Sequence, residues 1–291
     1  MRTVLRGTLP LLALLAMPAV AQETNPATST KPEPATPAAP TAPAAAPEFT
    51  FNGTATLVSD YRFRGISQTN RQAAVQGSLT ITHSSGLYAS IWGSSVDGYV
   101  TAAGDFYRDP ALRTGCCQAR QEIDLIAGYK RTVGGTSFDL GALFYWYPKR
   151  KAPGDNTSSN FIEPYLSVSH TYGPLTAKVT ANYAPKQKAL RLDQRSGPNR
   201  QNLYLAGDLS ASVPNTPLGL TAHLGHNFGP SWLATDSTGK KGYTDWGVGA
   251  TVTFKAFTVG VSYVDTNARF LSYDGRNASK GGIVGSVGVS F

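Results

Sequence analysis

The chain of 291 residues carries 26 Lys and Arg against 18 Asp and Glu, which gives a formal net charge of +8. Its two cysteines, Cys116 and Cys117, are adjacent; two ligands are too few for a zinc site, and the short Cα separation would strain a disulfide. We therefore expect a structural or incidental cysteine pair. After residue 21 no apolar run approaches the roughly 18 residues of a membrane-spanning helix, which excludes a helical membrane protein.

Residues 1–21 have the pattern of a secretory signal peptide. Arg2 and Arg6 precede a short apolar run and a small-residue cleavage site. Residues 22–48 are rich in Ala and Pro and poor in large apolar side chains, so they cannot bury enough surface to fold. We expect this segment to be a disordered periplasmic tether, and residues 49–291 to form the folded unit.

The stretch from Phe49 to Gly65 shows the rule that the rest of the chain follows. Apolar and polar residues alternate along it, and successive side chains of a strand point to opposite faces. Aromatic residues lie near both ends of the apolar face. The pattern predicts one long strand of a transmembrane β-barrel, with Tyr61 and Phe63 on the lipid-facing side.

Eleven further segments repeat this alternation, and the connections between them are alternately short and long. Short periplasmic turns and long outer loops are typical of outer-membrane barrels. The sequence predicts an all-β fold, a single antiparallel transmembrane barrel of about twelve strands, with both ends on the periplasmic side. The further segments are Ala73–His83, Leu87–Val96, Arg120–Arg131, Ser137–Tyr147, Asn160–Thr171, Leu175–Tyr183, Gln201–Val213, Leu218–Asn227, Tyr243–Phe254, Phe257–Val264 and Gly282–Phe291.

Three motifs make the chain similar to a known family. Ser59–Ser67 reads SDYRFRGIS, Leu87–Asp97 reads LYASIWGSSVD, and Glu122–Asp124 is followed by Gly128-Tyr129. In these motifs the chain resembles the TorF family of porins over almost everything after the tether. The resemblance implies a bacterial outer-membrane barrel that acts as a porin, and it brings no established functional residues.

The last strand ends at Phe291, with apolar residues on one face. This resembles the terminal strand that is read by the outer-membrane assembly machinery, which we expect to be a partner. The alternative is an ordinary last strand that happens to end in Phe.

Charged residues recur on the polar face of the predicted strands. A basic residue on the lipid face would cost about 2–4 kcal/mol at mid-depth, so these side chains must face water or one another. An open pore and a plugged lumen with paired charges both satisfy this, and we favour the pore. The expected pore-lining residues are Asp60, Arg62, Arg64, Glu122, Asp124, Glu163, Lys178, Asp208 and Asp245, with Lys130 and Asp139 on the same face.

Basic residues outnumber acidic ones in the long connections, most clearly at Lys149, Arg150 and Lys151. Such a surface suits the phosphates of lipopolysaccharide and also concentrates anionic solutes; we favour the lipid role. Nucleic-acid binding fits the basicity but not the compartment. The four histidines lack metal-ligand spacing and no G-x-S-x-G occurs, so we expect no enzyme, metal site or cofactor.

These observations predict an outer-membrane porin-like channel for passive diffusion of small hydrophilic solutes or ions. The first alternative is a non-conducting structural barrel that binds lipopolysaccharide at the surface. The second is a soluble secreted β-protein.

Overall fold

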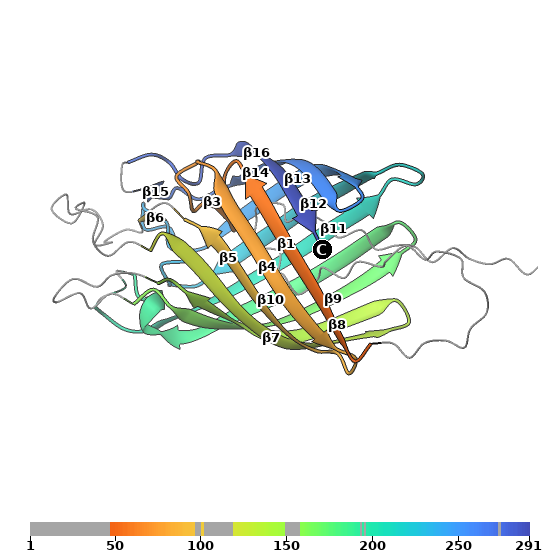
Figure 1. Cartoon of the computed structure of the whole chain (residues 1–291). Coiled ribbons are helices and arrows are strands. Elements are labelled where there is room, and N and C mark those ends of the chain that lie inside the picture. Colours follow the sequence, from red (N-terminus) through yellow and green to blue (C-terminus); the bar gives the residue numbers. More distant parts are fainter. Residues whose placement is uncertain are drawn as a thin grey trace, which may run out of the picture.

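The computed structural model describes residues 47–96, 100–101, 119–148, 158–192, 194, 196–272 and 275–291. Twelve antiparallel strands close into a single barrel (Figure 1) in the order β1-β16-β14-β13-β12-β11-β10-β9-β8-β7-β5-β4. The all-β, twelve-stranded barrel predicted from the sequence is confirmed. The expected signal peptide and almost all of the tether lie outside the described residues, as do Cys116, Cys117, Lys149, Arg150 and Lys151.

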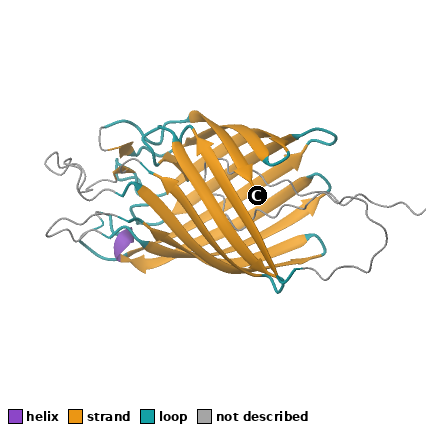
Figure 2. Ribbon diagram, in the orientation of Figure 1, coloured by secondary structure: helices purple, strands orange, loops and turns teal. Residues whose placement is uncertain are grey.

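The wall strands agree with the sequence prediction to within a few residues, except for the first. Among the described residues, two short pairs, β2–β3 and β6–β15, and the 3₁₀ turn η4 (Lys188–Leu190) lie outside the wall ladder (Figure 2). The short strands are β2 (Arg62–Phe63), β3 (Ile66–Ser67), β6 (Val100–Thr101) and β15 (Leu271–Ser272). The wall strands are β1 (Phe49–Val58), β4 (Ala74–His83), β5 (Leu87–Ser95), β7 (Gln121–Val133), β8 (Thr136–Trp146), β9 (Phe161–Tyr172), β10 (Leu175–Gln187), β11 (Arg200–Ser212), β12 (Leu218–Phe228), β13 (Tyr243–Phe254), β14 (Phe257–Thr266) and β16 (Gly282–Ser290).

The period of two decides which side chains face outward. On β13, Trp246, Val248 and Phe254 are exposed on the outside, whereas Asp245, which points to the opposite face, is fully buried. The same pattern on the other wall strands gives the barrel a continuous apolar exterior. Within the described residues, no helix is long and apolar enough to cross a membrane.

The connections differ at the two ends of the barrel. At the turn end, neighbouring strands are joined by a few residues, such as Gly134-Gly135 between β7 and β8, both with positive φ. At the loop end the connections are long, and β6 pairs with β15 there (Figure 1). The predicted alternation of short and long connections is confirmed.

The barrel closes between β1 and β16. Their register runs from Thr54 opposite Ser290 to Val58 opposite Ser286. Beyond the last strand, Phe291 and Gly53 exchange two backbone hydrogen bonds of 2.8 and 3.0 Å. The C-terminal residue therefore extends the ladder that closes the ring.

The prediction of one long first strand from Phe49 to Gly65 was wrong. β1 ends at Val58, and the chain then turns into the barrel interior. Tyr61 and Phe63, expected on the lipid face, are buried at 1% and 8% exposure. The alternation continues past Val58, but after Ser59, which still exchanges hydrogen bonds with Gly285 of β16, the polar residues Asp60, Arg62 and Arg64 have their partners inside the barrel.

Candidate functional site

Residues 59–73 form what we call the inward hairpin, built on β2 and β3. Phe63 pairs with Ile66, so Arg64 and Gly65 make a two-residue turn. Their φ angles are +48° and +81°. Two-residue hairpin turns favour positive φ at both positions, which Gly adopts freely and an L-residue such as Arg adopts at a cost.

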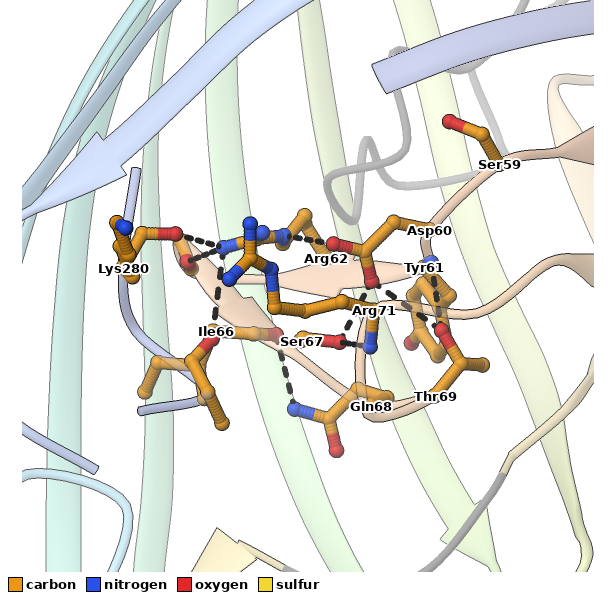
Figure 3. Close-up of polar contacts among 12 residues, drawn as sticks. Ser59, Asp60, Tyr61, Arg62, Ile66, Ser67, Gln68, Thr69, Arg71 and Lys280 are labelled. Atoms are coloured by element: carbon orange, nitrogen blue, oxygen red, sulfur yellow. Dashed lines mark hydrogen bonds and ion pairs between the residues drawn. The ribbon is translucent and has the colours of Figure 1, made fainter. Parts of the chain in front are cut away.

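A hydrogen-bond network fixes the base of the inward hairpin (Figure 3). Asp60 accepts hydrogen bonds from Arg62 Nε at 2.6 Å, from Ser67 Oγ at 2.6 Å and from Thr69 Oγ1 at 3.2 Å. Arg62 also donates from Nη1 to the carbonyl oxygen of Lys280 at 3.0 Å. The Asp60–Arg62 ion pair lies within the hairpin itself, and Arg62 ties the hairpin to the connection before β16.

The tip of the hairpin presses on the wall. A Cβ at Gly65 would lie 2.9 Å from Cβ of Asp245 and 3.0 Å from Cβ of Thr266. These contacts leave no room for a side chain. Gly65 is therefore required both by its φ and by this close approach to β13 and β14.

Arg64 at the same tip reaches a group of wall residues that we call the cradle: Glu163, Asn182, Tyr204, Tyr145 and Asn202. Nη2 of Arg64 donates to Oε2 of Glu163 at 2.6 Å, and both side chains are almost fully buried. The guanidinium lies 4.2 Å from the centroid of the Tyr204 ring, within cation–π range.

Other cradle residues hold Glu163 in position. Tyr145 donates to Oε2 at 3.1 Å, and Asn182 donates to the same oxygen at 3.3 Å. In the amide orientation that satisfies its neighbours, the Asn202 oxygen accepts from Nη1 of Arg64 at 3.3 Å. A buried guanidinium is thus held by a carboxylate on β9 and by an amide and an aromatic face on β11, and the carboxylate itself is held from β8 and β10.

A second contact ties the hairpin to β7. Tyr61 donates its hydroxyl to Oε1 of Glu122 at 3.0 Å, and its ring packs against Trp92 with centroids 5.4 Å apart. The hairpin therefore touches the wall on several sides, although only Arg64 among these contacts brings a positive charge to the opposite wall.

The hairpin and the surrounding wall form a layer from which solvent is excluded. Each of the twelve wall strands contributes an inward side chain that is at most 5% exposed at this level. The open lumen that we favoured is therefore not the arrangement of this structure, in which this layer is filled, with Glu163 paired to Arg64 and Glu122 bonded to Tyr61. The inward residues of the wall in this layer are Val58, Gln76, Ser94, Glu122, Tyr145, Glu163, Ala184, Asn202, Asn227, Asp245, Val264 and Val284.

Nearer the turn end, the interior carries a second polar network with partial solvent exposure. Asp208 accepts from Lys178 Nζ at 3.3 Å and contacts His223 Nδ1 at 2.6 Å, and these three side chains are 14–23% exposed. His223 Nε2 lies 3.1 Å from Asp245, which accepts from the Tyr204 hydroxyl at 3.0 Å. This network reaches from the exposed half of the interior to the cradle.

The sequence reasoning missed His223. It identified both carboxylates but considered the histidines only as metal ligands or as partners of a catalytic serine. Asp208 and His223 are direct cross-strand neighbours on β11 and β12, so strand parity together with register would have found the pair.

A third polar group lies on the wall from β5 to β9. Tyr88 donates to Oδ1 of Asp139 at 2.7 Å and its hydroxyl meets that of Tyr165. The two positions between these tyrosines in the ladder are Gly128 and Gly141, which leave space for both rings to lie flat against the wall.

The structure places all nine predicted pore-lining residues in the barrel interior, and it brings six of them into three direct ion pairs, Asp60–Arg62, Arg64–Glu163 and Lys178–Asp208. The inward positions of the wall strands and hairpin hold more carboxylates than cations. Among the described residues, the carboxylates are Asp60, Glu122, Asp124, Asp139, Glu163, Asp208 and Asp245, and the cations are Arg62, Arg64, Lys130, Lys178 and Arg200, with Arg71 exposed on the hairpin.

The charged inward residues of the wall lie on one side of the barrel. Every charged inward residue of the wall belongs to β7–β13, whereas β14, β16, β1, β4 and β5, which are fully described, present hydroxyl, amide, aromatic and small side chains inward. Within the described ranges, no group of three or more His, Cys, Asp or Glu is placed to hold a metal ion.

A closed, even-stranded antiparallel barrel with an apolar exterior and a charged interior has the architecture of a transmembrane β-barrel. The chain belongs to the Gcw_chp family, described as bacterial proteins of unknown function, whose model matches residues 41–287. No curated protein matches the sequence.

The fold of this chain resembles those of solved outer-membrane proteins. The NanC porin has a TM-score of 0.52 and 13% sequence identity, over 83% of this chain and 99% of that one. An outer membrane channel from Pseudomonas putida F1 has a TM-score of 0.44 and 11% identity, over 87% and 99% of the two chains. At such identities the first likeness establishes a shared barrel fold only.

Proposed function

We propose that the protein is an outer-membrane porin-like channel for passive diffusion of small hydrophilic solutes or ions. The observation that carries this proposal is a closed wall with apolar residues outside and charged residues inside. The resemblance to the TorF porins and the porin fold point the same way, and the signal peptide and periplasmic tether fit this compartment.

Conduction through this barrel requires the inward hairpin to move. The solvent-excluded layer includes all twelve strands, so the structure corresponds to a closed state. The hairpin is suited to move as a unit because Asp60 and Arg62 neutralise each other within it. Its contacts with the wall are then the ones that decide between closed and open.

The same layer favours a second candidate, a non-conducting structural barrel. In that case the buried ion pairs would be permanent, and the basic outer loops, including Lys149-Arg150-Lys151, would bind lipopolysaccharide. Recognition of the strand that ends at Phe291 by the assembly machinery is proposed for both candidates.

Recording from planar bilayers separates the two. The register offers a clean variant: Val58 and Ala74 are cross-strand partners, so Asn-Gly in place of residues 59–73 would join β1 and β4 by a two-residue turn. Circular dichroism and heat-dependent gel migration would verify the fold of both proteins.

For a channel, we expect stepwise conductance that is larger in the variant than in the full chain. Silence of both folded proteins would refute the channel and leave the structural barrel.

A further inference from the structure

We propose that the cradle of Glu163, Asn182, Tyr204, Tyr145 and Asn202 is a recognition site for solutes that carry a guanidinium group, and that Arg64 occupies it as an internal stand-in. The inference rests on the proposed function, because it names the solute class that the channel would select. It also makes the hairpin an autoinhibitory element that such a solute displaces.

The cradle belongs to the wall and not to the hairpin. Glu163 pairs with Leu143 of β8, and Asn182 pairs with Tyr204 of β11 and with Tyr165 of β9, at which pair the β9–β10 ladder ends. Tyr145 and Asn182 orient the Glu163 carboxylate independently of Arg64. The site therefore remains assembled when the hairpin leaves.

Arg64 does not use the full capacity of the cradle. Its hydrogen bond to Glu163 goes to Oε2, and the buried Oε1 has no hydrogen-bond partner among the described residues. A carboxylate can accept two parallel N–H bonds from one guanidinium. A solute guanidinium, free of the hairpin backbone, could reach both oxygens.

The interior charge favours a cation in this place. Without Arg64, seven inward carboxylates would face the inward cations Arg62, Lys130, Lys178 and Arg200, and Glu163 would be buried without a positive partner. A buried carboxylate strongly favours any cation that can replace the lost one. The Tyr204 ring adds selectivity for a flat cation that can stack on it.

The backbone conformation that places Arg64 in the cradle is also unfavourable. Arg64 adopts a φ of +48°, a left-handed conformation that L-residues other than Asn and Asp rarely occupy. A solute that binds the cradle would release this strained turn. Binding of the solute and displacement of the hairpin are therefore coupled.

The test uses the full-length refolded protein with Arg64→Ala and with the Asn-Gly hairpin replacement, both of which empty the cradle. The probe is methylguanidinium at concentrations below its denaturing range, compared with potassium at equal ionic strength. The readout is the midpoint of the heat-dependent shift in gel migration. We expect methylguanidinium to raise the midpoint of both variants and potassium to leave it unchanged.

A matched pair of double variants locates the site. Arg64→Ala with Glu163→Gln should lose the response, whereas Arg64→Ala with Asp139→Asn, which alters an interior carboxylate outside the cradle, should keep it. An equal response in the two double variants, or no response in either cradle-emptied protein, would overturn the proposal.

This binding assay is separate from conduction. If the folded proteins respond to methylguanidinium but stay silent in bilayers, the channel proposal fails and the cradle stands. If Arg64→Ala conducts potassium and methylguanidinium neither blocks the current nor shifts the midpoint, the cradle fails and the channel stands.

Discussion

Substitution of Gly65 by Ala should release the inward hairpin while it leaves the wall intact. Gly65 is at the tip of the hairpin, at a φ of +81°, and packs against β13 and β14. The left-handed conformation costs an L-residue about 1–2 kcal/mol. The new methyl would also lie 2.9 Å from Cβ of Asp245 and 3.0 Å from Cβ of Thr266, and such overpacking costs about 1–3 kcal/mol.

Together these costs disfavour the seated hairpin by about 2–5 kcal/mol. Because 1.4 kcal/mol corresponds to a factor of ten, the displaced population should rise by roughly 30- to 4,000-fold. Hydrogen exchange with mass spectrometry would measure this as lost protection of amides in residues 59–73. Amides of β9 and β10 should keep their protection.

Gly197→Ala is the matched control. Gly197 has a similar φ of +77°, and a Cβ there would meet nothing within 4 Å. It tests backbone strain without the close approach to the wall. Unchanged exchange of the hairpin in Gly65→Ala, or equal exchange in both variants, would refute the claim that the tip contact keeps the hairpin seated.

Three further predictions concern the rest of the barrel. Gly141→Ala should destabilise the wall by about 1–3 kcal/mol, measured as a lower urea midpoint, because its Cβ would lie 2.7 Å from the Ala127 carbonyl oxygen, which cannot rotate away. Burial raises the pKa of Asp236, but hydrogen bonds from the Thr238 side chain and from backbone N–H groups outweigh it and lower the pKa below its ordinary value. The resulting stability is present above the unfolded pKa of about 3.9 and is lost as the pH falls through the lower folded pKa. Asp236→Asn should therefore make the outer loops more sensitive to proteolysis at pH 7, and equal sensitivity of the two proteins there would contradict this. Deletion of Phe291 removes two backbone hydrogen bonds at the closing seam and should lower the refolding yield, whereas an unchanged yield would show that the seam closes without it.

Strand positions could be predicted from the sequence because parity is a local property. Each wall strand must alternate between lipid and interior, so the polar and apolar residues reveal its extent and its facing. The first strand shows where this reasoning fails. Alternation persists from Phe49 to Gly65, yet the ladder ends at Val58: Phe49–Val58 pair with β4, and Thr54–Val58 pair with β16 as well.

The alternation pattern does not show that residues 59–73 leave the wall, but the density of charged residues in this segment is a clue. Asp60, Arg62 and Arg64 place three ionised groups within five residues and are followed by Gly65. A wall strand near the rim could carry them in water, so the sequence alone permits both interpretations. Which one holds depends on Glu163, about a hundred residues away in the chain, and such non-local pairs are not visible in one sequence.

The one-sided charge distribution explains why the hairpin crosses the interior from its particular origin. It starts between β1 and β4, whose inward hydroxyls satisfy one another, as Thr54 and Ser78 do at 2.7 Å. Departure of the hairpin would therefore leave no unpaired charge on that side. On the opposite wall it would leave Glu163 without a counter-ion, and an uncompensated buried charge costs more than a weak pair gains. The closed and open states thus differ chiefly in what neutralises Glu163, so a cation that enters the interior would set the balance between them.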